Sequence, residues 1–229
     1  MFAEFDLSGA LTSFVEITMQ LTSGMAASVT IFVLTLLFSL PLGLVVMFGR
    51  MSKFKPLQWL TKLYISIMRG TPLMLQLLVV FFGPFYLFRV KLSSDYRFYA
   101  VIIGFVINYA AYFAEIYRGG IQSIPHGQYE AAQVLGYSRS QTFVKIILPQ
   151  MVKRVLPSVG NEVITLVKDT SLAYVIGVVE MFTRAKQINA APGGMGLWAF
   201  LAAGVIYYVF NFIVTVVMDQ VEKKMSYYQ

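Results

Sequence analysis

The chain has 229 residues, of which 58% are hydrophobic and 13% are charged, and its mean hydropathy is +0.69. Soluble domains carry about 25% charged residues, so this composition excludes an ordinary soluble enzyme and indicates a protein embedded in lipid. The absence of cysteine and the single histidine, His126, exclude a disulfide framework, a thiol nucleophile and a metal site built on a Cys or His cluster, while the net charge of +7 fits either nucleic-acid binding or membrane topology.

Five stretches of the chain have the composition of membrane helices. A bilayer core of about 30 Å requires about 20 apolar residues per helix. Residues 1–24 contain acidic residues but no Lys or Arg, so we expect an extracytoplasmic amphipathic lead-in rather than a signal peptide. We expect residues 25–229 to form one all-α transmembrane domain. Its five predicted membrane helices cover about 25–49, 72–88, 98–117, 155–182 and 197–218.

The basic residues between these helices predict their orientation. One set of loops holds twelve Lys and Arg residues: Arg50, Lys53, Lys55, Lys62, Arg69, Arg118, Arg139, Lys145, Lys153, Arg154, Lys223 and Lys224. The other set holds five: Arg89, Lys91, Arg97, Arg184 and Lys186. Because Lys and Arg accumulate in cytoplasmic loops, the N-terminus is predicted outside and the C-terminus in the cytoplasm. The same distribution accounts for most of the net charge without nucleic acid.

A helix break is predicted just before the second span. Thr71 as an N-cap and Pro72 in the first helical position would open a new helix after Gly70. Broken helices of this kind present partial positive charge to anionic solute groups in transporters, so Thr71 and Gln76 are candidate pathway residues. The alternative is an interfacial elbow in which Arg69 reaches the lipid phosphates.

The third span carries polar residues on one face. Asn108, Tyr112 and Glu115 follow at i, i+4 and i+7. Glu115 is predicted to pair with Arg118, three residues on. Asn108 and Tyr112 either contact solute or form hydrogen bonds with a neighbouring helix, and the pattern favours helix packing.

The fourth span is polar in its middle, where a polar side chain in lipid is costly and marks a functional site. On a helical wheel the polar residues fall within an arc of about 120° and extend over about 12 Å. Lys168 can face a solute carboxylate, and an acidic residue or Asn161 can receive an ammonium. Alternatively, Lys168 and a carboxylate satisfy each other. This predicted polar stripe consists of Asn161, Glu162, Thr165, Lys168 and Asp169.

The stretch from about 118 to 154 is long and regular, on the side predicted to be cytoplasmic. A short helix-forming run ends at Gly136, which suits a left-handed C-terminal position. Ser138 and Gln141 then have the spacing of a capping box that opens a second helix. We predict two short helices joined by a sharp bend. The pattern leaves open whether they dock into another protein or lie on the headgroups.

The residues of this stretch resemble the EAA loop of the membrane subunits of bacterial ATP-binding cassette (ABC) importers. The markers are Glu130-Ala131-Ala132, Gly136 after three intervening residues, and Ile146-x-Leu148-Pro149 after nine more intervening residues. Three further segments are similar to permeases of the polar amino acid uptake family, which includes histidine, glutamine, arginine and cystine importers: 69–73, 108–120 and 166–172. The segment 166–172 is more similar to glutamine- and cystine-type members than to basic amino acid ones.

This resemblance implies a permease subunit in a bacterial inner membrane, not itself an enzyme. The implied partners are two ABC ATPase subunits, a second permease copy or a paralogue, an extracytoplasmic solute-binding protein and an amino acid substrate. ATP and Mg²⁺ are expected on the ATPase, because this chain has no Gly-Lys dipeptide and therefore no phosphate-binding loop. The implied ATPase-coupling residues are Glu130, Ala131, Ala132, Gly136, Leu148 and Pro149.

Two functions of other classes remain as alternatives. A secondary transporter or channel driven by an ion gradient would use Lys168 and Asp169 as a proton relay, but it would leave the EAA loop unexplained. A membrane-embedded enzyme would need a metal cluster or a pairing of nucleophile and base, and the sequence contains neither pattern. We therefore expect an ATP-driven amino acid importer subunit.

Overall fold

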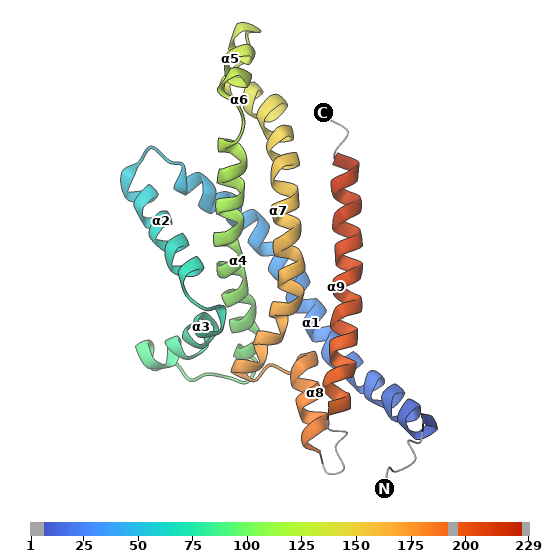
Figure 1. The fold of residues 1–229 in the computed structure, drawn as a ribbon. Coiled ribbons are helices and arrows are strands. Elements are labelled where there is room, and N and C mark those ends of the chain that lie inside the picture. Colours follow the sequence, from blue (N-terminus) through green and yellow to red (C-terminus); the bar gives the residue numbers. More distant parts are fainter. Residues whose placement is uncertain (1–6, 192–196, 226–229) are drawn as a thin grey trace. The chain divides into compact units, whose positions relative to one another are not determined.

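The computed structural model describes the backbone of residues 7–191 and 197–225, with side chains from Val15 onward. Every regular element in these ranges is helical, which confirms the all-α prediction for the described chain (Figure 1). The elements are α1 (Leu7–Arg50), α2 (Lys55–Gly70), α3 (Leu73–Phe88), α4 (Tyr96–Gln122), α5 (His126–Val134), α6 (Arg139–Thr142), η1 (Phe143–Ile147), α7 (Leu148–Asp169), η2 (Thr170–Ile176), α8 (Met181–Ala190) and α9 (Leu197–Met225).

Three described helices are long and apolar enough to cross a membrane on their own: α1 over Val15–Arg50, α4 and α9. The pair α2 and α3 passes the same test only when taken together, as a span bent by 113°. The predicted break after Gly70 is therefore present, although α3 begins at Leu73, one residue after Pro72. Part of the predicted lead-in, residues 1–6, lies outside the described chain; from Leu7 the helix continues into α1 without a break.

The predicted fourth span differs from a single helix. α7 ends at Asp169, a 3₁₀ helix follows over Thr170–Ile176, and Gly177 turns the chain with a φ of 77°. With 22 residues, α7 is about 33 Å long, which is enough to cross a bilayer core. It is amphipathic rather than apolar, because the predicted polar stripe runs along it. That is why length and apolarity together do not mark it as a span.

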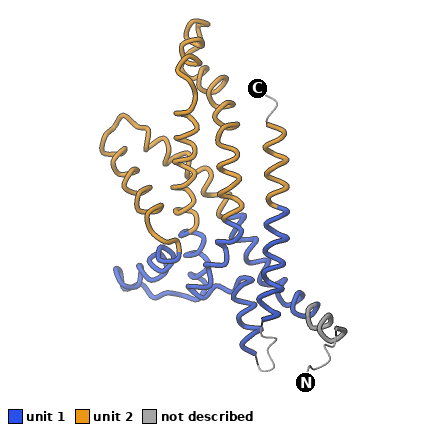
Figure 2. The backbone as a smooth tube through the Cα atoms, viewed as in Figure 1, with its two compact units in different colours: residues 1–34, 74–104, 166–213 blue, residues 35–73, 105–165, 214–229 orange. Residues whose placement is uncertain are grey.

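The chain divides into two compact units (Figure 2): unit 1 is 1–34, 74–104 and 166–213, and unit 2 is 35–73, 105–165 and 214–229. In unit 1 the first half of α1 packs with α8 and α9 around a buried apolar cluster that includes Leu21, Met181 and Ala202. Gly24 permits close approach here, since a Cβ at this position would lie 2.7 Å from the Met181 Cα. The Met181 N–H donates to Ser28 Oγ at 3.3 Å.

In unit 2 the core is an aromatic column on α4. Phe105, Tyr109, Phe113 and Tyr117 follow at intervals of four, so they share one helix face, and each is at most 7% exposed. Successive ring centroids lie 6.1–6.4 Å apart. α1 packs closely on this column at Gly43, where a Cβ would lie 2.8 Å from the Phe113 Cβ.

Candidate coupling loop and substrate-facing residues

The segment between α4 and α7 forms a helical hairpin at one end of unit 2 (Figure 1). We call α5, the turn at Gly136 and α6 the coupling hairpin. α5 ends in a Schellman motif: the Gly136 N–H donates to Gln133 O and the Tyr137 N–H to Ala132 O, both at 3.0 Å. Gly136 has a φ of 76°, as its predicted left-handed position requires.

The predicted capping box opens the second arm of the hairpin. The Gln141 N–H donates to Ser138 Oγ at 3.3 Å, and the Ser138 N–H donates to Gln141 Oε1 at 2.9 Å. Together with the Schellman motif, these hydrogen bonds satisfy backbone N–H and C=O groups that otherwise have no intrahelical partner at a helix end. The shape of the coupling hairpin is therefore fixed by its own residues.

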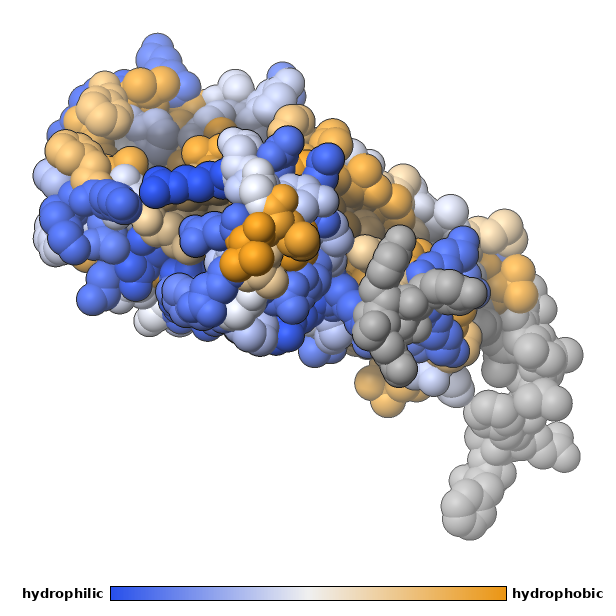
Figure 3. Space-filling model, turned by 90° about the horizontal axis from the view of Figure 1, so that it is seen from above, coloured by the Kyte–Doolittle hydropathy of each residue, from blue (hydrophilic) through white to orange (hydrophobic). Residues whose placement is uncertain are grey.

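The predicted coupling residues do not all lie on the surface of the hairpin. Glu130, Ala131 and Gly136 are exposed, whereas Ala132 is only 1% exposed and packs inside. The exposed tip instead carries two apolar residues that the sequence analysis did not single out, Val134 and Leu135, exposed by 88% and 72%. Figure 3 looks at the molecule from the α5–α6 end and shows mainly hydrophilic residues with small hydrophobic patches between them.

The second arm is not the separate short helix that we predicted. α6 continues through the π-helical turn η1 into α7, since the residues at both joints, Phe143 and Leu148, have right-handed helical backbone angles. Pro149 has no N–H to donate to the fourth residue before it. Just before Pro149 the backbone hydrogen bonds change from the α-helical to the π-helical pattern, because the Leu148 N–H donates to Phe143 O, five residues back. The arm that begins at Ser138 thus leads directly into α7.

Side chains fasten the hairpin and the start of α7 to the end of α4. The Gln150 amide donates to Gln128 Oε1 at 3.2 Å, and Arg154 Nη1 donates to Ser123 O at 2.7 Å. At Gly120 the two helices touch, because a Cβ there would lie 2.2 Å from Val155 Cγ1. These contacts join the hairpin to the start of α7, and the start of α7 to the end of α4.

The predicted pair of Glu115 and Arg118 is present on α4. Arg118 Nε donates to both Glu115 oxygens, at 3.1 and 3.0 Å, and its Nη1 reaches Gln122 Oε1. Arg50, the last residue of α1, adds a second cation with its Nε 3.6 Å from Glu115 Oε1. This cluster joins the end of α1 to the end of α4.

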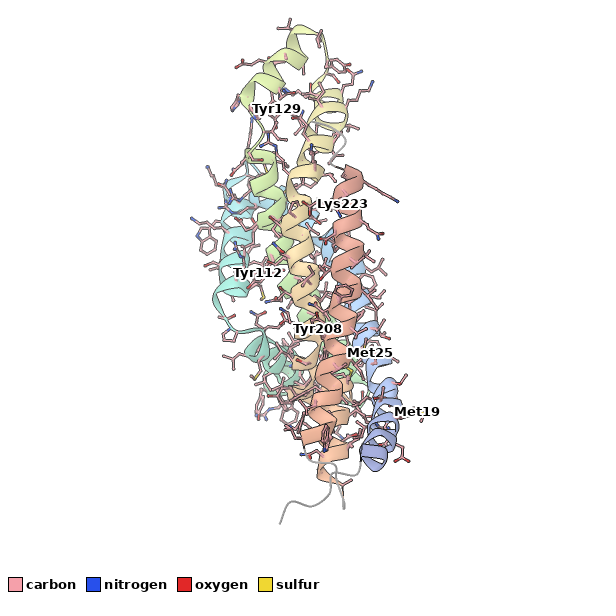
Figure 4. All side chains as sticks on the ribbon, turned by 45° about the vertical axis from the view of Figure 1, so that its right-hand side comes forward. Met19, Met25, Tyr112, Tyr129, Tyr208 and Lys223 are labelled. Atoms are coloured by element: carbon pink, nitrogen blue, oxygen red, sulfur yellow. The ribbon has the colours of Figure 1, made fainter. Side chains whose placement is uncertain are left out.

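A cavity of about 400 Å³ lies at the end of α2, lined by Ile65, Ser66, Arg69, Gly70 and Tyr112. Tyr112, labelled in Figure 4, comes from α4. Its ring centroid lies 5.3 Å from the Arg69 guanidinium carbon, a cation–π contact. Arg69, the candidate interfacial anchor, thus lines this cavity and is the cationic residue among the five described residues that form its wall.

The other predicted residues near the helix break are spread over different surroundings. The Asn108 amide, 4% exposed, donates to Met68 O at 3.2 Å, which is the helix-packing role favoured by its pattern. Thr71 is exposed and its hydroxyl donates to Ile67 O in the last turn of α2. Gln76 is buried on α3. Of the four residues from this region, only Tyr112 lines the cavity.

The predicted polar stripe lies along α7. Asn161, Thr165 and Lys168 are exposed, and Glu162 and Asp169 are half-buried. Within the described chain Lys168 forms no ion pair, so the alternative in which it is neutralised by a carboxylate of its own protomer is not formed here. A cationic side chain on an exposed face of a lipid-embedded protein needs another polar surface beside it.

The comparisons with known proteins decide the family. Residues 39–227 match the family described as "Binding-protein-dependent transport system inner membrane component". The chain belongs to this family. Its members are permease components of transport systems, and a permease of this kind is not itself a catalyst. The predicted membrane embedding follows from this membership and from the apolar helices.

Individual relatives in this family are amino acid permeases. The L-cystine transport system permease protein TcyB of Bacillus subtilis (strain 168) is 36% identical over 208 residues, which cover 91% of this chain and 87% of that protein. The arginine transport system permease protein ArtQ of the same organism is 37% identical over 203 residues, or 89% and 91% of the two chains. A putative glutamine transport system permease protein GlnP of Rickettsia felis is 33% identical over 193 residues, or 84% and 87%.

Solved structures share the fold. A crystal structure of an amino acid ABC transporter with histidines superposes with a TM-score of 0.85 at 29% identity, covering 98% of this chain and 100% of that one. A chain of the MetNI methionine ABC transporter, in a structure of its inward-facing conformations, superposes with a TM-score of 0.67 at 15% identity, covering 98% of this chain and 99% of that one, which shows the common fold alone. The chain is therefore a permease of the amino acid ABC transporter type.

Proposed function

We propose that this permease is the transmembrane subunit of an ATP-driven amino acid importer and that the coupling hairpin transmits the ATPase cycle to its translocation pathway. The observation that carries this proposal is the hairpin itself. It is rigid by its own capping, exposed at an apolar tip and continuous with α7. A self-supporting helical projection with uncovered apolar side chains fits docking into a groove of another protein.

We infer different roles for the EAA residues from their exposure and side-chain chemistry. Glu130 and Ala131, exposed on α5, are available to the ATPase, the first as an anion and the second as a small contact. Val134 and Leu135 add the apolar anchor. Ala132 and Leu148, buried and half-buried, are assigned to packing within the loop, and Gly136 makes the bend.

The polar stripe on α7 is the proposed wall of the pathway. Its exposed residues Asn161, Thr165 and Lys168 are too polar for lipid, so a second permease, either a copy or a paralogue, is expected to cover them and enclose the path. Lys168 is assigned to the carboxylate of the cargo, with Asp169 or Glu162 at its ammonium. The cavity of Arg69 and Tyr112 on α2 and α4 offers a further polar lining.

The complete complex follows from these assignments. Two ATPase subunits that bind ATP and Mg²⁺ are expected to dock on the hairpins, and a solute-binding protein is expected on the opposite side of a bacterial inner membrane. The proposed topology has five membrane helices, with α7 as the fourth, the N-terminus outside and the C-terminus in the cytoplasm. A polar amino acid is the proposed cargo, which is consistent with the cystine, arginine and glutamine permeases among the relatives.

The test of the proposal is the substitution Gly136→Val. The left-handed φ of 76° is costly for L-residues and most of all for a β-branched one, so the hairpin is expected to lose its docking shape while the protein still inserts into the membrane. We expect ATP-dependent uptake to fall about tenfold or more, the factor that about 1.4 kcal/mol of backbone strain corresponds to, and solute no longer to stimulate ATP hydrolysis. Uptake and ATP hydrolysis are measured in membrane vesicles at matched expression.

The matched control is Gly127→Val. Gly127 lies in the first turn of α5, has open space around its Cα and does not have a positive φ. The same side chain is therefore added to the same hairpin without backbone strain. Normal transport by both variants would refute the coupling role. Uptake that collapses with a protonophore while ATP persists would instead favour an ion-driven transporter.

A further inference from the structure

A second cavity, of about 290 Å³, lies in unit 1, away from the residues assigned above. Tyr174 on η2 lines one part of it, and α8 supplies the rest through Thr183, Lys186, Gln187 and Ala190. The α8 residues follow at i, i+3, i+4 and i+7, so one helix face forms the wall. The volume is close to the lower end of the range for small-ligand sites.

The polar groups of this cavity are mainly donors. Lys186 is exposed, with its Nζ 5.0 Å from the Tyr174 ring centroid, and it forms no ion pair with any residue of the described ranges. The Tyr174 ring is itself held by an edge contact with Phe182, with centroids 5.4 Å apart. Gln187 Oε1 accepts from Arg184 Nη1 at 3.1 Å, which leaves the Gln187 amide protons for another acceptor.

The nearest carboxylate on α8 cannot neutralise Lys186. Glu180, the N-cap of α8, is fully buried. Its two oxygens accept four hydrogen bonds, from the N–H groups of Phe182 and Thr183 at 2.7 Å, from Thr183 Oγ1 at 2.9 Å and from the Tyr207 hydroxyl at 3.0 Å. Glu180 is therefore a positioning residue that fixes where α8 begins, and the charge of Lys186 stays uncompensated.

We propose that the cavity of Tyr174, Lys186 and Gln187 is a binding site for the α-carboxylate of a free amino acid. One ammonium beside one amide donor matches a singly charged planar acceptor. The size of the cavity fits a whole small molecule rather than the tip of a side chain. The site rests on the proposed function, which supplies the amino acid, and on the proposed topology, in which Arg184 and Lys186 lie on the outer side. It serves as a loading site that holds cargo before it enters the pathway.

The experiment uses the fact that the chain contains no cysteine. Ala190→Cys places a single thiol at the edge of the cavity, in the full chain and in membrane vesicles. Its modification is followed with anionic ethylsulfonate and cationic ethyltrimethylammonium methanethiosulfonates. Each rate is divided by the rate of the same reagent with a free thiol. We expect this normalised anionic-to-cationic ratio to exceed one and to fall about fivefold or more when Lys186→Gln is added, because one charge at this range acts on the two reagents in opposite directions.

Ligand protection identifies the occupant. L-glutamine, L-cystine and L-arginine are tested against their α-amides, which lack the carboxylate. We expect at least one of the three amino acids to slow modification of Ala190→Cys while its amide does not. Lys186→Gln should abolish this protection, and Lys186→Arg should retain it. Lys91→Gln, an exposed lysine on the same predicted side, is the control that keeps the protection.

Three outcomes overturn the inference: no amino acid protects the thiol, the amides protect equally well, or only an added solute-binding protein protects it. In the last case the cavity is a docking point for that protein. Uptake is measured on the same vesicles, so the two failures are distinguishable. ATP-driven uptake without protection removes only this site, whereas uptake that does not require ATP removes the proposed function.

Discussion

The coupling hairpin and the polar stripe of α7 are both polar and exposed in a chain that is otherwise apolar, yet they are built in opposite ways. The hairpin satisfies its helix ends internally, through the capping box at Ser138 and the turn at Gly136. The stripe leaves Lys168 exposed and without an ion pair in the described chain. The hairpin thus satisfies the backbone groups at its bend with its own residues, whereas the stripe requires a second polar surface to cover its exposed charge.

This contrast fits the two roles that we propose for these regions of the permease. A docking element has to keep its shape whether or not its partner is bound, so its own hydrogen bonds fix it. A pathway has to offer unpaired polar groups to a cargo, so it is completed only in the assembly. The bond from Gln150 to Gln128 joins the hairpin to α7, the helix that carries the stripe, and the close contact of Gly120 with Val155 joins α7 to α4.

The largest effect is expected at the tip of the hairpin. Val134→Ser together with Leu135→Ser removes two exposed apolar side chains. If each contributes about 1.5–3 kcal/mol when buried by a partner, the affinity for the ATPase subunit should fall about 100-fold or more. Co-purification over a concentration series measures this. Gln133→Ser, an exposed neighbour without an apolar side chain, should retain the ATPase, and equal loss in both variants would remove the apolar anchor from the account.

The next effect concerns the stripe. Lys168→Met removes the proposed carboxylate contact, and a hydrogen bond to a charged group contributes about 1.5–3 kcal/mol, so the apparent KM for uptake should rise about tenfold or more. Lys91→Met, outside the helices, should leave it unchanged. An unaltered KM in Lys168→Met would mean that the stripe packs against the second permease without touching cargo.

The contact between α4 and α7 can be tested through the stability of the protein. Gly120→Ala places a methyl group 2.2 Å from Val155 Cγ1, and such overpacking costs about 1–3 kcal/mol, so the Tm of the purified protein should fall. Adding Val155→Ala makes room and should restore part of the loss. Gly119→Ala is the control, because nothing lies within 4 Å of its added Cβ, and its Tm should stay level or rise. Identical behaviour of Gly119 and Gly120 would disprove the close contact.

The smallest effect is expected for the capping box. Ser138→Ala removes the side-chain acceptor for the Gln141 N–H and should destabilise the hairpin by about 1 kcal/mol. Hydrogen exchange of the α6 amides reports this local opening. Ser140→Ala, within the same helix, should leave the exchange of the α6 amides close to that of the unaltered protein. If Ser138→Ala also left the exchange of the α6 amides unchanged, interactions other than the capping box would stabilise the hairpin.

The sequence predicts the parts of this molecule that depend on neighbours along the chain. The Gly136 bend, the Ser138–Gln141 box, the Glu115–Arg118 pair and the break after Gly70 all follow from local rules, and the structure contains each of them. The assignment of site residues to coupling or to cargo remains a prediction.

The features that the sequence did not reveal depend on residues far apart in the chain or on the surface of the fold. The burial of Ala132 beside the exposed Ala131 depends on how α5 packs. Glu180 lies at the end of an apolar run that has the composition of a membrane helix, and the hydrogen bond that its carboxylate accepts from Tyr207 of α9 joins residues far apart in the chain. The continuity of α6 with α7 depends on the π-helical turn before Pro149, for which the local pattern has no clear signal.

The most direct test of the central claim is uptake by the purified complex in reconstituted vesicles. Amino acid transport is measured in the presence of the solute-binding protein, with ATP and Mg²⁺ at the ATPase-facing side, with and without vanadate, and with a protonophore. The account predicts that uptake requires an ATPase subunit that co-purifies with the permease, stops with vanadate and continues in the presence of the protonophore. Uptake by the permease alone, driven by a proton gradient in the absence of ATP, would contradict it.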